Sequence, residues 1–385
     1  MITRRTLLGG IAATAATAAL AGRAAGAPAP RAAGPLPLHI VNASGAYANT
    51  SAWVYVIGNA GGQQVRVTPD GRLAPVALAD NGTDGFTDYA IPLAGSGPTT
   101  LQLPPMSGRI YVSLGGKLKI KAVADGNGKP ALAYPAGWVA GDPNFDVLHD
   151  CAEFTYDASG MHCNTTMVDM FSVPLALHLT GAADQTTGTL KEGARAKVFA
   201  DVKAAAGFDR LVVGDRRVIA PGHGLDTGLF AADYLNSAID EAWSAYTAKD
   251  LKVTTNAGTF TGRTKGDQLT FTGPGGTLSF TKPSTRDVLF CDGVLAAPND
   301  GIRGPVAAVL GAALNRSTLA THAAQPVTDP AAFYAPPHTN HYSRAMHAAT
   351  KDGKAYGFAF DDVAGFASYI EDPAPKELTL TLTPF

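Results

Sequence analysis

Residues 151–175 read CAEFTYDASGMHCNTTMVDMFSVPL, and two parts of this stretch have the β-branched and aromatic character of strands. We expect one strand at Phe154–Tyr156 and a second at Thr165–Phe171, with Tyr156 to Cys163 as their connection. The stretch therefore predicts an antiparallel hairpin within a β-rich fold.

Two acids of this stretch, Glu153 and Asp169, have no Lys or Arg near them in the sequence, since none occurs from 151 to 190. Carboxylates without a counter-ion are costly to bury, and an acid/base pair that faces a substrate explains them better than a salt bridge does. If they oppose each other across the hairpin, they point to the same face of the sheet. The apolar neighbours of Glu153 make it the better candidate for the proton donor. Two partly exposed acids on a sheet are the alternative.

The composition is that of a globular protein with a large core. The 385 residues suggest roughly two domains, and 46% of them are apolar. Thirty Lys and Arg against 32 Asp and Glu leave the chain near neutrality, which indicates neither a nucleic-acid partner nor a polyanionic substrate.

The order of predicted elements indicates a β domain interrupted by an insertion. Alternating strand patterns and turn signals continue from 37 to 179 and return after 341, including the segments 355–363 and 378–383. Between them, 180–340 contains helical patterns at 190–206, 231–249 and 304–315, a strand meander at 251–282 and a short strand at 288–291. We therefore predict a β domain formed by 37–179 and 341–385, with an inserted mixed α/β domain at 180–340.

The N-terminus has the features of an export signal. Thr3-Arg-Arg-Thr-Leu-Leu8 matches a twin-arginine signal, and an Ala-rich apolar run follows it to Leu20. We expect 1–36 to comprise this signal and a disordered Ala/Pro-rich linker, and the protein to be secreted. An uncleaved N-terminal anchor is the alternative.

The cysteines leave one question open. Export would permit a Cys151–Cys163 disulfide, but that pair centres on position 157, whereas Glu153 and Asp169 centre on 161. Both pairings can hold only if 157–166 is an irregular loop.

Four segments together resemble a known family: CAEFT (151–155), NTTMVDMFSVPL (164–175), HYSRAMH (341–347) and AYGFAFDDV (355–363). They are similar to glycoside hydrolase family 64, the thaumatin-like β-1,3-glucanases of the laminaripentaose-producing type. The resemblance covers essentially everything after the linker. It implies a thaumatin-like β-sandwich or barrel and an α/β domain flanking a wide groove, with no cofactor. It also implies an inverting, endo-type enzyme with Glu153 as general acid and Asp169 as general base.

The resemblance further implies substrate contacts at Thr155, Asp157, His162 and Thr166. An aromatic residue is usual at the position of His162, and an exposed loop histidine is the alternative interpretation there. Of the aromatic residues that could stack on sugar rings (Trp53, Tyr55, Trp138, Tyr156, Tyr342), we choose Tyr156 for its place in the motif.

The acidic pair Asp361 and Asp362 is a further candidate for substrate binding, because a comparable pair borders the cleft of thaumatin-like folds. Capping of a strand is the alternative. His338, His341 and His347 lack a carboxylate or cysteine companion at a suitable spacing, so no metal site is predicted.

The leading hypothesis is a secreted, monomeric hydrolase that cuts β-1,3-glucan such as laminarin, curdlan or fungal wall glucan. It would have no nucleic-acid partner and no membrane association after export. The alternative is a thaumatin-like protein that binds β-1,3-glucan without cutting it.

Overall fold

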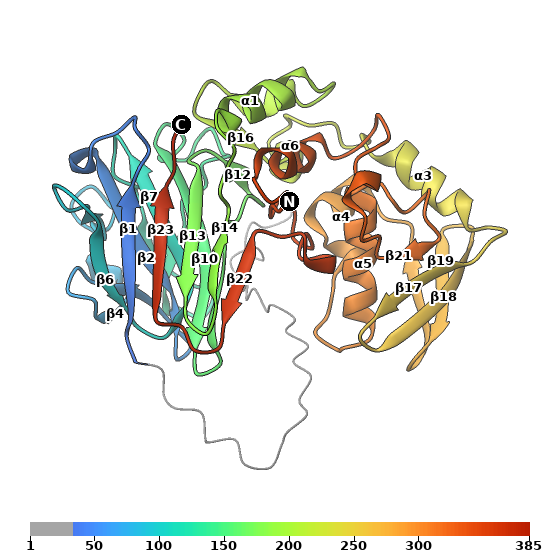
Figure 1. The fold of residues 1–385 in the computed structure, drawn as a ribbon, viewed down its shortest axis with the longest axis horizontal. Coiled ribbons are helices and arrows are strands. Elements are labelled where there is room, and N and C mark those ends of the chain that lie inside the picture. The colour runs from blue at the N-terminus through green and yellow to red at the C-terminus, as the bar shows by residue number, and fades with distance from the viewer. Residues whose placement is uncertain (1–33) are drawn as a thin grey trace, which may run out of the picture.

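The computed structural model describes residues 34–385 and shows a mainly β protein with a second, mixed α/β part, as expected (Figure 1). The predicted twin-arginine signal and nearly all of the linker lie outside the described residues.

The β part is a sandwich of two sheets. The first sheet has the strand order β14, β13, β23, β1, β6, and its central strands β1 and β23 run parallel. The bounds of these strands are Asp184–Thr187, Leu175–Thr180, Glu377–Leu382, Leu36–Asn42 and Thr99–Leu103.

The second and larger sheet has the strand order β22, β11, β10, β7, β2, β3, β4, with β5 paired to β2. Their bounds are Tyr369–Asp372, Gly160–Asn164, Leu148–Asp157, Met106–Leu114, Ala52–Ala60, Gln63–Val67, Leu73–Pro75 and Ile91–Pro92. Strands β8 (Lys121–Ala124) and β9 (Pro130–Ala133) form a separate ladder.

The sandwich core follows from strict alternation along the strands. In β10, Ala152, Phe154 and Tyr156 point inward and are buried, together with Leu38 of β1 and Leu380 of β23. The residues between them in β10 must point to the other face of the larger sheet. That other face carries the candidate site.

The α/β part has a core of its own, in which helices pack against a sheet with the order β20, β19, β18, β17, β21. These strands are Gly276–Thr281, Gln268–Gly273, Gly258–Lys265, Leu251–Thr255 and Ala324–Gln325. The helices α1 to α6 are Ala194–Ala204, Pro221–Asp226, Asn236–Ala245, Thr285–Phe290, Arg303–Asn315 and His341–Ala349. A small sheet of β12 (Met170–Phe171), β16 (Arg217–Ile219) and β15 (Val212–Val213) lies beside them.

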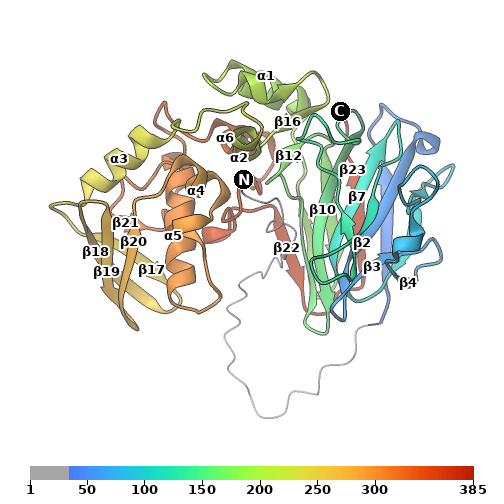
Figure 2. The ribbon, with the colours of Figure 1, turned by 180° about the vertical axis from the view of Figure 1, so that it is seen from behind.

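The two parts lie side by side, and α1, α2 and α6 lie along one end between them (Figures 1 and 2). Strand β22 is at the edge of the sandwich that faces the α/β part (Figure 2). None of the helices described in 34–385 is both long and apolar enough to cross a membrane.

Several predicted elements are confirmed, among them the helices in 190–206, 231–249 and 304–315 and the final strand. The predicted strand at 288–291 is wrong, because α4 covers most of that segment. Ser284 accepts a hydrogen bond from the Asp287 N–H while the Asp287 carboxylate accepts from the Ser284 N–H, and this capping box starts a helix.

The predicted strand at 355–363 is also wrong. Tyr356 makes one isolated bridge to Thr166, and the chain then turns. The chain rejoins the sandwich at Tyr369 rather than at 341, because α6 carries Tyr342 and Met346 into the core of the α/β part.

Candidate active site

The hairpin at the centre of the site is tighter than predicted. Strand β10 extends through Asp157, and β11 begins at Gly160, so that Glu153 lies opposite Asn164 rather than Asp169. The expected second strand over Thr165–Phe171 is reduced to β12. The predicted opposition of Glu153 and Asp169 within one hairpin is therefore wrong.

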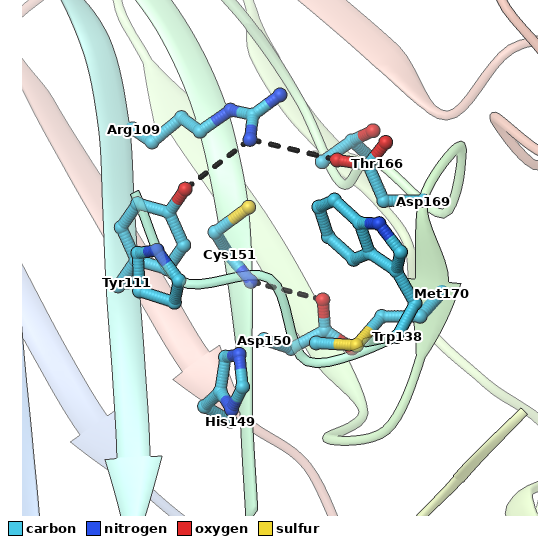
Figure 3. Close-up of a pocket in the computed structure, with 10 residues that line it drawn as sticks. Arg109, Tyr111, Trp138, His149, Asp150, Cys151, Thr166, Asp169 and Met170 are labelled. Carbon is cyan, nitrogen blue, oxygen red and sulfur yellow. Dashed lines mark hydrogen bonds and ion pairs between the residues drawn. The ribbon is translucent and has the colours of Figure 1, made fainter. Parts of the chain in front are cut away.

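The counter-ion that the local sequence lacks comes from the neighbouring strand. Arg109 of β7 lies directly opposite Glu153 on its other side. Its Nη2 lies 2.8 Å from Glu153 Oε1, its Nε donates to the same oxygen at 3.0 Å, and its Nη1 lies 3.5 Å from Asp169 Oδ2. Nη1 also donates to the Tyr111 hydroxyl at 3.2 Å (Figure 3). One guanidinium therefore joins the two acids.

The segment before β12 brings Asp169 to this position. Met167, two residues before Asp169, donates its N–H to the Tyr356 carbonyl at 2.9 Å. The Met167 carbonyl accepts from the Tyr342 hydroxyl at 2.6 Å. The Asp169 carbonyl accepts from the N–H of Ala220, which caps α2. The chain thus leaves the sheet after Asn164 and is fixed by three other segments.

Helix α2 also fixes the Asp169 side chain. His223 Nε2 lies 2.8 Å from Asp169 Oδ1, and the His223 ring stacks on Trp138 with ring centroids 4.2 Å apart. Trp138, Asp169, Thr166 and Arg109 line one pocket, with Tyr111 and Cys151 at its wall (Figure 3).

The surroundings of Asp169 favour its ionised form. Burial raises the pKa of Asp169, but the hydrogen bond from His223 and the charge of Arg109 outweigh it, so that this pKa lies below its usual range. Burial opposes the charge of Arg109 as well, yet Tyr111, Glu153 and Asp169 raise the Arg109 pKa above its ordinary value. Asp169 is therefore suited to accept a proton.

The separation of the two carboxylates is limited by the guanidinium between them. Because they contact different nitrogens of one planar group at 2.8 and 3.5 Å, their nearest oxygens are at most about 9 Å apart. That limit admits the separation of about 6.5–9.5 Å that leaves room for a water molecule in an inverting glycosidase.

Two of the predicted substrate-binding residues lie next to Glu153 on the same face. Thr155 is opposite His162, one row of the sheet beyond Glu153. His162 Nδ1 lies 2.8 Å from the Tyr369 hydroxyl and 3.0 Å from Glu371 Oε2, both on β22. His162 is thus part of a strand with defined partners, not of a loop. Asp157 ends β10 and accepts from the Ser159 N–H and hydroxyl.

Thr166 and Tyr156, the other two predicted substrate-binding residues of the motif, lie in different surroundings. Thr166 lines the pocket beside Asp169. Tyr156 points into the sandwich core, is 6% exposed, and donates its hydroxyl to the Gly34 carbonyl at 2.7 Å. The structure therefore separates Tyr156 from the acids, because successive residues of a strand point to opposite faces.

The pair Asp361 and Asp362 is divided between interior and surface. Asp361 has no exposed area; its carboxylate contacts Arg316 and His347 at 2.9 Å each and accepts from the Gly357 N–H at 3.0 Å. Asp362 is exposed. Burial nevertheless raises the pKa of the Asp362 carboxyl.

The cysteines do not pair in the structure; all three are buried and free. Cys163 points into the sandwich core, opposite Phe154, whereas Cys151 points to the other face beside Tyr111. A bridge would have to pass through the sheet. Among residues 34–385, no group of three or more His, Cys, Asp or Glu is arranged to hold a metal ion.

Three residues of the site were not predicted as such: Arg109, His223 and Trp138. The segment around His223 reads as a turn without chemistry, and Trp138 was one of several aromatic candidates. Arg109 lies 44 positions from Glu153, and His223 lies 54 positions from Asp169. Only the strand register and the position of α2 bring them together.

Comparison with known proteins places the chain in a family. The family model described as beta-1,3-glucanase, glycoside hydrolase family 64, matches residues 34–382. A glucan endo-1,3-beta-glucosidase of Cellulosimicrobium cellulans is 36% identical over 299 residues, which are 74% of this chain and 54% of that protein. The chain therefore spans about half the length of this relative.

Two solved structures are similar over most of the chain. One is a laminaripentaose-producing beta-1,3-glucanase in complex with laminaritetraose, with a TM-score of 0.83, 35% identity and coverage of 91% of this chain and 99% of that one. The other is a family 64 beta-1,3-glucanase domain from Clostridium beijerinckii, with a TM-score of 0.80, 28% identity and coverage of 91% and 98%. The family model matches nearly all of residues 34–385, and the fold is shared with these two structures. The chain therefore belongs to glycoside hydrolase family 64, the β-1,3-glucanases.

Proposed function

We propose that the protein hydrolyses β-1,3-glucan with inversion at the anomeric carbon. The observation that supports this most directly is the pair of carboxylates, Glu153 and Asp169, held on one face by Arg109 and supplied by different segments. The relatives named as β-1,3-glucanases, and one of them in complex with laminaritetraose, indicate the substrate class.

In the proposed reaction, Glu153 donates a proton to the leaving glycosidic oxygen. Asp169 accepts a proton from the water that attacks the opposite face of the anomeric carbon. The ionised state favoured at Asp169 fits the base, and no group other than these side chains and water is required.

The face of the larger sheet offers the groups that would hold the glucan. Thr155 and His162 lie one row from Glu153, Asp157 lies at the end of β10, and Thr166 borders the pocket. We assign these residues to substrate binding. Trp138, half-buried in the pocket wall, is a better candidate than Tyr156 for an apolar sugar contact.

Replacing either acid tests the proposal. Glu153→Gln and Asp169→Asn should each lower the release of reducing ends from laminarin or curdlan by roughly 100- to 10,000-fold, because each removes a proton-transfer group. Binding of both variants to insoluble curdlan should persist. Wild-type protein that binds curdlan but releases no oligosaccharide would instead indicate a non-catalytic glucan-binding protein.

The stereochemistry can be observed directly. In an NMR time course with a linear β-1,3-glucan, the first product signal should be the α anomer, which then mutarotates. A β anomer at early times would exclude single displacement.

We also propose that the protein is secreted by the twin-arginine pathway, on the strength of Thr3-Arg-Arg-Thr-Leu-Leu8, and that it is a monomer. Its detection in the cell pellet rather than in the culture medium would argue against export, and size-exclusion chromatography would test the monomer.

A further inference from the structure

Arg109 contacts the two acids unequally. Its Nε donates to Glu153 Oε1 at 3.0 Å and its Nη2 lies 2.8 Å from the same oxygen, whereas Asp169 Oδ2 lies 3.5 Å from Nη1. Glu153 Oε2 has a different neighbour, Asn164 Nδ2, at 3.5 Å. An oxygen that accepts one N–H of a cation and lies 2.8 Å from a second nitrogen of that cation is a poor place for a proton, so Oε2 is the oxygen of Glu153 that can carry one.

We infer that Arg109 is a positioning residue with two effects: it selects Oε2 as the proton-donating oxygen of Glu153, and it couples the protonation of the two acids. This inference rests on the function proposed above. The contact of Arg109 with Asp169 has the complementary effect. His223 occupies Oδ1, and the longer contact with Arg109 leaves Oδ2 the more accessible oxygen for a water molecule.

The coupling follows from charge. With both acids ionised, the cluster of Arg109, Glu153 and Asp169 carries one net negative charge, and one added proton makes it neutral. A cation within about 4–6 Å favours the ionised form of a carboxylate, and two carboxylates near each other disfavour it. Without Arg109, His223 still acts on Asp169, but no cation contacts both acids, and the pair would take up its first proton at higher pH.

The other titratable groups that face Arg109 do not replace it. Tyr111 and Tyr134 lie beside it, Cys151 is on the adjacent strand, and burial raises the pKa of each of these three groups. His223 faces Asp169 from α2 on the far side of that carboxylate. Arg109 is thus the group that contacts both acids at once.

A matched control comes from the same row of the sheet. Arg66 of β3 is opposite Ile57, and Ile57 is opposite Arg109. Two strand spacings place Arg66 about 10 Å from Arg109. The substitution Arg66→Met removes an equal charge from the same face without touching either acid.

The experiment is a ¹³C NMR titration of the side-chain carboxyl carbons, with Glu153→Gln and Asp169→Asn used for assignment. In Arg109→Met, both titration steps of the pair should move upward by at least about one pH unit relative to wild type. Arg109→Lys, which keeps the charge, should move them by less than half as much, and Arg66→Met should leave them in place. The pH profile of hydrolysis should shift in the same direction in Arg109→Met.

Equal titration curves in Arg109→Met and wild type, or an equal shift in Arg66→Met, would overturn the inference. Thermal unfolding of each variant identifies one that does not fold, and Arg109→Lys then decides. Restoration of the full wild-type rate by Lys would overturn the selection of Oε2, because Lys has a single nitrogen and cannot set two nitrogens of one planar group beside the same oxygen. The titration requires no substrate. It therefore reports on Arg109 separately from any failure of the proposed hydrolysis.

Discussion

Asp169 is held from two sides by cationic or polar groups that are distant in the sequence. Arg109 contacts one oxygen, and His223, stacked on Trp138, contacts the other. Hydrogen bonds to charged groups contribute about 1.5–3 kcal/mol, which corresponds to a rate effect of roughly 10–100-fold if the bond orients a base. His223 is therefore more than a residue in a turn.

Replacing His223 should change both rate and pH dependence. His223→Leu should lower kcat by roughly 10–100-fold. Because the hydrogen bond from His223 lowers the pKa of Asp169, its loss should move the acidic limb of the kcat profile to higher pH. His223→Gln can place an amide N–H near the position of Nε2 and should recover part of the rate. Steady-state kinetics on laminarin between pH 4 and 9 measure this, and an unmoved acidic limb in His223→Leu would contradict it.

The hairpin of β10 and β11 determines which residues share a face with Glu153. Its turn, Asp157 to Gly160, is short, and the register places Thr155 opposite His162. Gly160 has a φ of +123°, and a Cβ there would lie 2.2 Å from the Asp372 carbonyl oxygen of β22. Only glycine allows the turn to approach the neighbouring strand this closely.

Gly160→Ala should therefore destabilise the protein by about 2–4 kcal/mol, since it adds a backbone clash to an unfavourable φ. Gly128, in the turn between β8 and β9, has a φ of +78° with open space around its Cβ position, and serves as the control. Gly128→Ala should cost only about 1 kcal/mol. Chemical denaturation measures both, and an equal loss in the two variants would argue against the close approach.

The two parts of the molecule meet beneath the site through buried polar side chains. Arg217 of β16 has no exposed area and donates to the carbonyls of Gly137 and Val147 at 2.8 and 2.7 Å, next to His149. This contact holds the segment that leads to Trp138. His149 Nδ1 donates to the Val147 carbonyl at 2.8 Å, and its Nε2 has no hydrogen-bond partner within the described part of the chain.

This arrangement predicts sensitivity to acid. Burial and the nearby charge of Arg217 lower the pKa of His149 to about 3, so the unfolded chain binds a proton near pH 6.5 that the folded protein does not. The contribution of His149 to stability should be complete above pH 6.5 and fall as pH decreases toward 3, by up to about 1.4 kcal/mol per unit, whereas the neighbouring Asp150, whose pKa burial raises to about 7, acts in the opposite direction. His149→Phe should flatten this part of the curve.

The comparison to make is the change in unfolding free energy between pH 7 and pH 4.5, in wild type and in His149→Phe. Taking the change rather than the absolute value removes any packing cost of the substitution. Equal changes in the two proteins would show that His149 does not dominate acid unfolding.

Local patterns in the chain were enough to predict the class of fold and to single out Glu153 and Asp169 as candidates. Alternation predicted strands such as β1, β2, β7 and β23, and helical spacing predicted α1, α3 and α5, because these patterns depend on neighbouring residues. The motif around Glu153 and Asp169 predicts an acid and a base, and these roles stay a prediction until the variants are measured. Local spacing did not indicate that 288–291 is helical, since the capping box of Ser284 and Asp287 outweighs the strand-like composition.

Contacts between distant segments decided three features of the site. These are the Arg109 counter-ion, the hydrogen bond from His223 to Asp169, and the face of the sheet on which each motif residue lies. Strand register, not sequence distance, sets Arg109 opposite Glu153, and the packing of α2 brings His223 to Asp169. A short turn instead of a long loop turned Tyr156 and Cys163 to the core and left Cys151 on the other face. A shift of one residue in register exchanges the two faces of a strand, and single-chain patterns do not contain the register. The sequence thus singled out Glu153 and Asp169 as candidates, and the fold supplied the charged and polar groups that surround them.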